Sequence, residues 1–168
     1  MAYQMSSPLW PSKGENFFRN FVINPLKQQG PHCVSTVLAM LVNTSPEKFQ
    51  ESINTQDPVS WSNALKKHGL KLAYCPNDIR KLRFYADELL QLNDLFTLSY
   101  YTVKNSVEIL HDPDASGWIC GSHIVILHKG QIIDPASGKR YIMSDHKCLN
   151  FHTKRIFRVV PSDFQRGL

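Results

Sequence analysis

One cysteine stands where a stiff polar loop meets an apolar segment. The loop is KQQGPH (27–32), and the segment that follows is CVSTVLAMLV (33–42). Gly30 and Pro31 favour a turn directly before the cysteine. At a helix N-terminus, unpaired backbone N–H groups and the helix dipole favour a thiolate, which is the nucleophilic form of the side chain. We therefore interpret Cys33 as a candidate nucleophile whose own N–H can bind an oxyanion.

A thiolate nucleophile needs a proton carrier, and the chain has seven histidines. His123 stands out because it lies in GSHIVIL, at the start of an apolar β-prone stretch. The chain then turns at Lys129-Gly130 and returns as QIIDP, so a hairpin would bring Asp134 back toward the level of His123. A carboxylate there fixes the histidine tautomer and stabilises the imidazolium. Cys33, His123 and Asp134 thus predict a nucleophile, a general acid/base and an orienting group.

These motifs resemble the papain-like cysteine hydrolase superfamily. SHIVILHKGQIIDP is similar to its bacteriocin-processing peptidases, and KQxGxxC is similar to Josephin-type deubiquitinases. The resemblance, over roughly 25–45 and 118–140, implies a papain-like fold and a glutamine whose amide completes the oxyanion hole. Gln28, five residues before Cys33, takes that role as in the Josephin-type enzymes, and Gln29 is the alternative.

The sequence departs from the family pattern at two positions. Papain-like and bacteriocin-processing peptidases usually place the glutamine six residues before the cysteine, where this chain has Lys27. His32 directly precedes Cys33, where many relatives have a small or acidic residue. This second imidazole either modulates the thiol or points to solvent.

The resemblance implies a cysteine peptidase-like hydrolase that cleaves a peptide or isopeptide bond through a thioester, without a cofactor. Its predicted partner is a protein or peptide substrate. Glutamine deamidation and acyl transfer use the same route and remain alternatives. A non-catalytic papain-like module that binds a peptide in the cleft is a further alternative.

A zinc site is a competing hypothesis for some of the same residues. Cys120-x-x-His123 has ligand-like spacing, and His146, Cys148 and His152 supply three more donors. However, the paired C-x-x-C of most structural zinc sites is absent, and strand positions i and i+3 point to opposite faces. We therefore predict no metal ligands.

Composition and charge narrow the classes of protein to which the chain can belong. The 168 residues, 42% hydrophobic and 20% charged, fit one globular domain. The net charge of +5 is spread without interleaved aromatics, so no nucleic-acid partner is expected. No apolar run is long enough to span a membrane, and the N-terminus lacks the pattern of a secretory leader. We expect a cytoplasmic protein, with signal-less secretion still open, and no disulfide framework; the oligomeric state is undefined.

The expected elements place helices before a sheet. Helices are predicted from the Ser12-x-x-Glu15 capping box, over 33–42, over 46–53 with Ser45 as N-cap, over 60–68 ending at Gly69, and over 78–92. Strands are predicted over 70–75, over 95–103, in HIVIL, QIID and RYIM, and over 154–160. This order predicts a single α+β domain over 1–168, mainly helical in 12–93 and an antiparallel sheet in 95–160.

Overall fold

A computed structural model of the chain describes residues 8–102 and 121–168. Its helices are α1 (Cys33–Val42), α2 (Glu47–Gln50), α3 (Pro58–Lys66) and α4 (Ala86–Leu92), with 3₁₀ segments η1 (Leu82–Tyr85), η2 (Met143–Asp145) and η3 (Lys147–Asn150). Its strands are β1 (Leu70–Cys75), β2 (Leu95–Tyr101), β3 (Ser122–His128), β4 (Gln131–Asp134), β5 (Lys139–Ile142) and β6 (Thr153–Pro161). Cys120, and with it part of the zinc hypothesis, lies outside the described residues.

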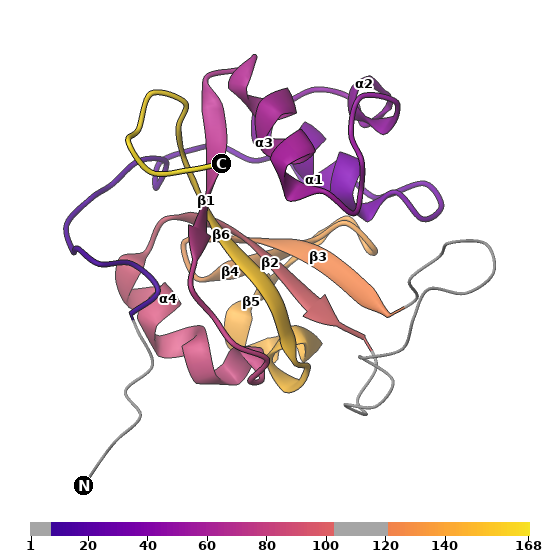
Figure 1. The fold of residues 1–168 in the computed structure, drawn as a ribbon. Coiled ribbons are helices and arrows are strands. Elements are labelled where there is room, and N and C mark those ends of the chain that lie inside the picture. Colours follow the sequence, from indigo (N-terminus) through magenta and orange to yellow (C-terminus); the bar gives the residue numbers. More distant parts are fainter. Residues whose placement is uncertain (1–7, 103–120) are drawn as a thin grey trace, which may run out of the picture.

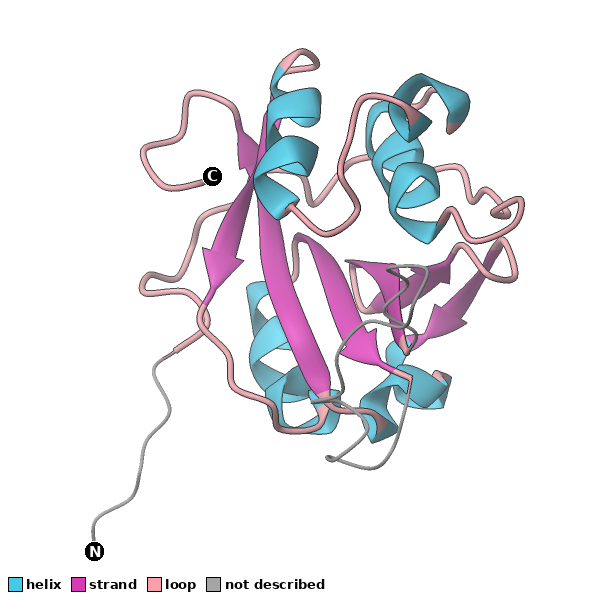
Figure 2. Cartoon of the chain, turned by 45° about the vertical axis from the view of Figure 1, so that its right-hand side comes forward, coloured by secondary structure: helices cyan, strands magenta, loops and turns pink. Residues whose placement is uncertain are grey.

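The six strands form one antiparallel sheet in the order β1-β6-β2-β3-β4-β5. Helices α1, α2 and α3 cover one face, and α4 lies against the other (Figures 1 and 2). The predicted α+β class with an antiparallel sheet is therefore confirmed. Within the described residues, no helix has the length and apolar character needed to cross a membrane.

Apolar clusters fill both faces of the sheet, which explains the unbroken apolar run of β3. Ile124 and Ile126 pack under α1 and α3, whereas Val125 and Leu127 pack toward α4. A strand buried on both faces needs apolar side chains at every position rather than at alternate ones. The first residues of β3 are less buried, so its N-terminal end opens toward the helical layer.

The N-terminal segment is irregular, with bends and a turn, where a helix was expected, so the helix predicted from Ser12 is wrong. Ser12 Oγ does donate to Glu15 Oε2 at 2.6 Å, but this is a bond between side chains and caps no backbone group. The N–H groups of Phe17 and Phe18 instead donate to the buried carboxylate of Asp94, each at 2.9 Å. These tertiary bonds tie the backbone to Asp94, just before β2, and the chain bends and turns there instead of forming a helix.

Helix α1 has the predicted bounds, but its neighbours α2 and α3 do not. The helix expected over 46–53 is only Glu47–Gln50, and its N-cap is Pro46 rather than Ser45. Helix α3 begins two residues before the expected residue 60 because Asp57 accepts a bond from the N–H of Val59 at 3.0 Å and proline follows it.

The helix expected over 78–92 begins only at residue 82. Lys81 forms an isolated β-bridge with His152, which holds this part of the chain extended. Its first turn, η1, is a 3₁₀ helix, and α4 continues to Leu92. Asn93 then ends the helix in the left-handed conformation, with φ of 48°.

Candidate active site

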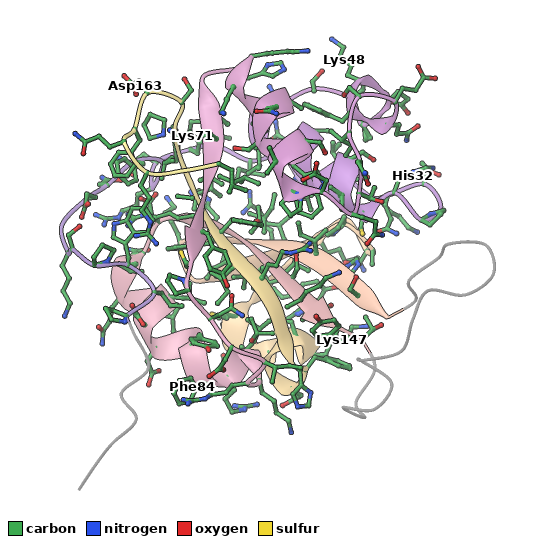
Figure 3. The ribbon with its side chains drawn as sticks, viewed as in Figure 1. His32, Lys48, Lys71, Phe84, Lys147 and Asp163 are labelled. Carbon is green, nitrogen blue, oxygen red and sulfur yellow. The ribbon has the colours of Figure 1, made fainter. Side chains whose placement is uncertain are left out.

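Cys33 is the first residue of α1, as the sequence predicts, and it is half-buried. The first N–H groups of any helix lack intrahelical acceptors, and no side chain within residues 8–102 and 121–168 caps those of α1. Residues Val34 to Leu41 are buried against the sheet and the neighbouring helices, which fixes the helix axis and the position of its N-terminus. His32, on the loop before the helix, is exposed and faces outward (Figure 3).

His123 and Asp134 come together in the β3–β4 hairpin. Ile126 pairs with Ile133 across the hairpin, so continuing the register sets Asp134 diagonally across from His123 on the same face. His123 Nε2 lies 2.7 Å from Asp134 Oδ1, and because a carboxylate only accepts, the imidazole donates. His123 Nδ1 is then left for proton exchange with Cys33.

The protonation behaviour of the pair follows from its neighbours. Burial by itself would lower the pKa of His123, but its hydrogen bonds to Asp134 and Cys33, and their charges, raise that pKa to about 9. Burial would raise the pKa of Asp134, but bonds from His123, His146 and the Ala136 N–H hold it well below its usual range. A carboxylate and an imidazolium are thus both favoured beside the thiol.

His146 is a member of this network that the sequence did not assign. Its Nε2 donates to Asp134 Oδ2 at 2.9 Å, while its Nδ1 accepts the N–H of Cys148 at 3.0 Å. The second bond fixes the tautomer, because the nitrogen that accepts cannot carry the hydrogen. Buried His146 therefore orients the carboxylate that orients His123.

Tyr100 on β2 packs behind the imidazole of His123, and the sequence alone assigns it no role. It lies directly opposite His123 in the strand register, and the two rings make an edge-on contact with centroids 5.7 Å apart. Burial, with a smaller contribution from the charge of Asp134, raises the pKa of its phenol. Tyr100 thus closes the apolar side of the His123 ring.

The loop that carries the two glutamines is held against the turn after Asp134. The Gln28 N–H donates to the carbonyl of Pro135 at 2.7 Å. Gly138, with φ of +69°, approaches the backbone of Lys27 so closely that a Cβ would lie 3.1 Å from its nitrogen. Gln28 is half-buried in the wall of the site, whereas Gln29 is exposed, so the geometry favours the first choice.

A cavity of about 420 Å³ lies in front of the thiol. Its lining comes from the residues Gln28, Pro31, Cys33, Val34, Thr55, Gln56, Trp61, Ser99, Ser122, His123, Ile124, Lys154 and Arg155. Asp134 is only 4% exposed and lies behind His123 rather than in the wall. The structure thus gathers the predicted Cys33, His123 and Gln28 around one cavity, with Asp134 as support.

The other described cysteines differ sharply from Cys33. Cys75 and Cys148 are buried and unpaired, and no disulfide joins any of the three in the described part of the chain. Burial raises the pKa of each of these two thiols to about 12. Both therefore behave as small core residues, and they are poor nucleophiles.

The described donors of the zinc hypothesis, which exclude Cys120, do not gather into a site. His146 is engaged by Asp134, and Cys148 is enclosed in the core. Across residues 8–102 and 121–168, no group of three or more histidine, cysteine or acidic side chains is arranged to hold a metal ion.

Comparison with protein-family models gives no match for this chain, and neither does comparison with curated protein sequences. The function is therefore inferred from the geometry of the site.

Proposed function

We propose that the protein is a papain-like cysteine hydrolase that cleaves an amide bond, in a peptide or an isopeptide, through a thioester. One observation carries this proposal. A half-buried cysteine at an uncapped helix N-terminus shares a cavity with a histidine whose far nitrogen is bound 2.7 Å from a buried aspartate. The arrangement supplies a nucleophile, a proton carrier and an orienting carboxylate.

The order of elements supports the same superfamily. The nucleophile begins the most buried helix of the first half, and the histidine and aspartate come from consecutive antiparallel strands of the second half. Helix α1 packs directly on β3, so Cys33 and His123 approach each other from two layers of the fold. This is the arrangement that the resemblance implies for a papain-like domain.

In the proposed reaction, Cys33 transfers its proton to His123 and the thiolate attacks the carbonyl carbon of the substrate. The tetrahedral intermediate collapses as the His123 imidazolium gives its proton to the leaving nitrogen, which departs as an amine. His123 then takes a proton from water, and the hydroxide attacks the thioester carbonyl. Collapse of this second intermediate releases the carboxylic acid and restores the thiol of Cys33.

Two donors are proposed to stabilise the oxyanion. The first is the N–H of Cys33, at the helix terminus. The second is the side-chain amide of Gln28, whose Nε2 donates one hydrogen to the Gly30 carbonyl at 2.9 Å and keeps a second hydrogen for substrate. The bond from the Gln28 N–H to the Pro135 carbonyl fixes the loop that presents this amide.

The proposal is tested by following iodoacetamide labelling of each cysteine against pH, with peptide mass spectrometry. We expect Cys33 to be labelled far faster than Cys75 and Cys148, and labelling at Cys33 to persist well below pH 8. Substitution His123→Ala should slow labelling of Cys33 by about tenfold or more at neutral pH, because the thiolate loses its imidazolium partner.

The matched control is His32→Ala, which removes the exposed imidazole next to Cys33 in the chain. It should leave the labelling profile unchanged. Labelling that follows an ordinary thiol, with a midpoint near pH 8.5 and no response to His123→Ala, would overturn the proposal.

A further inference from the structure

We infer that Lys154 and Arg155 form a carboxylate-binding subsite beside Cys33, so that the substrate carries a carboxylate next to the bond that is cleaved. The inference rests on the proposed function, because only a hydrolase has a substrate bond to cleave. It also predicts separately that the cavity prefers negatively charged molecules. It is drawn from the register of β6, from the lining of the cavity and from the absence of acidic partners within the described residues.

A β-bulge aims both cations into the cavity. Strands β2 and β6 pair Ser99 with Arg155, but the next pair is Tyr100 with Thr153, so Lys154 is an extra residue on β6. In a regular strand, consecutive side chains point to opposite faces of the sheet. Here both Lys154 and Arg155 line the cavity, as expected where a bulge re-aims a side chain next to an active site.

The two cations are held in place by aromatic and polar neighbours rather than by acids. Lys154 Nζ lies 5.8 Å from the centre of the Tyr101 ring and donates weakly to Ser122 Oγ at 3.4 Å. The Arg155 guanidinium lies 6.0 Å from the centre of the Trp61 ring. Such contacts position a cation without neutralising its charge.

No carboxylate balances this charge in the part of the chain that the structure describes. None of the described ion pairs includes Lys154 or Arg155, and the cavity lining contains no aspartate or glutamate. Burial lowers the pKa of Lys154, and the neighbouring Arg155 lowers it further, which shows that each cation is unfavourable for the other. An anion that enters the cavity would relieve this repulsion.

A carboxylate fits the cavity better than the Cys33 thiolate does as the partner of both cations. The thiolate already has an imidazolium beside it, so its single negative charge is balanced without either cation. Arg155 offers a planar fork of donors that suits a two-oxygen acceptor, and Lys154 offers a point charge next to it. Together they suit a carboxylate of the substrate bound in the cavity that Cys33 and His123 also line.

The test compares two alkylating agents of nearly the same size, iodoacetate and iodoacetamide, which differ in charge. For each, the Cys33 thiolate displaces iodide from carbon, so the rate ratio cancels the reactivity of the thiolate itself. We expect the iodoacetate-to-iodoacetamide ratio at Cys33 to exceed that of the Lys154→Met, Arg155→Met double variant by roughly fivefold or more at low salt, because the charge of His123 acts alike in both proteins. Raising the ionic strength should reduce the ratio.

Substitutions Lys154→Met and Arg155→Met should each lower this ratio by about threefold or more. The matched control Lys48→Met removes an exposed lysine on α2, away from the site (Figure 3), and should leave the ratio as it is. If Lys154 instead only stabilised the Cys33 thiolate, its substitution would slow the reaction with both reagents equally. An unchanged ratio would therefore overturn the inference.

The outcomes separate the two proposals. Fast iodoacetamide labelling with a ratio no higher than that of the double variant would leave the hydrolase standing and remove the subsite. Slow labelling by iodoacetamide, with a raised ratio that depends on Lys154 and Arg155, would remove the hydrolase and leave an anion-binding cleft.

A final pair of peptide probes distinguishes a carboxylate on an acidic side chain from the carboxylate at a chain terminus. An acetylated peptide amide with one glutamate side chain, and the matching glutamine peptide with a free C-terminus, are each used to protect Cys33 from iodoacetamide. Protection by the first identifies an acidic side chain, and protection by the second identifies a chain terminus. If neither protects better than the uncharged glutamine amide, the cations do not select a carboxylate.

Discussion

Two buried carboxylates, Asp94 and Asp134, are held in nearly the same way and are suited to different tasks. Asp94 accepts the N–H groups of Phe17 and Phe18 and is paired with Arg158 at 2.6 Å. Asp134 accepts three donors as well, from two imidazoles and one backbone N–H. Both are less than 5% exposed, so burial alone does not separate a structural carboxylate from a site carboxylate.

The partners of the two carboxylates make the difference. The guanidinium group of an arginine stays charged, and that of Arg158 is enclosed by aromatic rings, 4.7 Å from the centre of the Trp10 ring. An imidazole can gain and lose a proton, and His123 borders a cavity that contains a thiol. A buried carboxylate with all its hydrogen bonds made becomes part of a candidate active site when its partner can gain or lose a proton and borders a cavity.

The largest expected effect is the loss of stability when the Asp94 centre is broken. Substitution Asp94→Asn leaves the Arg158 charge buried without its counter-ion and should lower the free energy of unfolding by about 3–5 kcal/mol, measured by urea titration. Labelling of Cys33 in the folded protein should not change, because the two centres share no partner. The double substitution Asp94→Asn, Arg158→Met should regain part of the loss. A double variant that is less stable than Asp94→Asn would contradict this account.

Substitution of Asp134 is expected to cause a smaller loss of stability together with slower labelling of Cys33. In Asp134→Asn, the amide cannot accept from both His123 and His146 with full strength, and the charge that supports the imidazolium is gone. We expect a loss of about 2–3 kcal/mol in the free energy of unfolding and about tenfold slower labelling of Cys33 at pH 7. If stability falls while the labelling rate stays at its original value, Asp134 would be structural in the same sense as Asp94.

The smallest effect is a pH dependence of stability that only the Asp134 centre should show in the alkaline range. The pKa of His123 is raised above its unfolded value near 6.5 to about 9, so its contribution is complete below about pH 6.5 and is lost as the pH rises through 9. The pKa of Asp134 is lowered, so its contribution is complete above about pH 4 and is lost as the pH falls.

Urea titrations from pH 7.5 to 9 check the alkaline part of this dependence. The difference in unfolding free energy between the original chain and His123→Ala should shrink by about 1–2 kcal/mol across that range. A difference that stays constant with pH would mean that His123 carries no raised pKa in the folded protein.

Local patterns sufficed for the parts of the site that depend on local structure. The turn before Cys33 and the apolar run after it define a helix start, and the hairpin around Gly130 fixes the relation of His123 to Asp134. The α+β class followed in the same way, from helical periodicity in the first half and short β-prone runs in the second. Each of these features is set within about ten residues of the chain.

The missed parts depend on contacts between distant segments. His146 reaches Asp134 from the bend between η2 and η3, which no periodicity marks. Tyr100 meets His123 through a β2–β3 register that the sequence does not specify. Trp61 enters the cavity wall from α3, a helix that had no assigned role. The bulge at Lys154 is a one-residue shift in pairing, and only the three-dimensional register reveals it.

The central claim, a thiolate and an imidazolium joined as a pair, is tested most directly by NMR titration of the His123 ring. Its resonance is assigned by its absence in His123→Gln, and its pKa is measured in the original chain and in Cys33→Ala. The account predicts a pKa of about 9 in the original chain and a clearly lower one without the thiol, while the bond to Asp134 remains. A pKa near 6.5 in both, or one that does not respond to loss of Cys33, would contradict it.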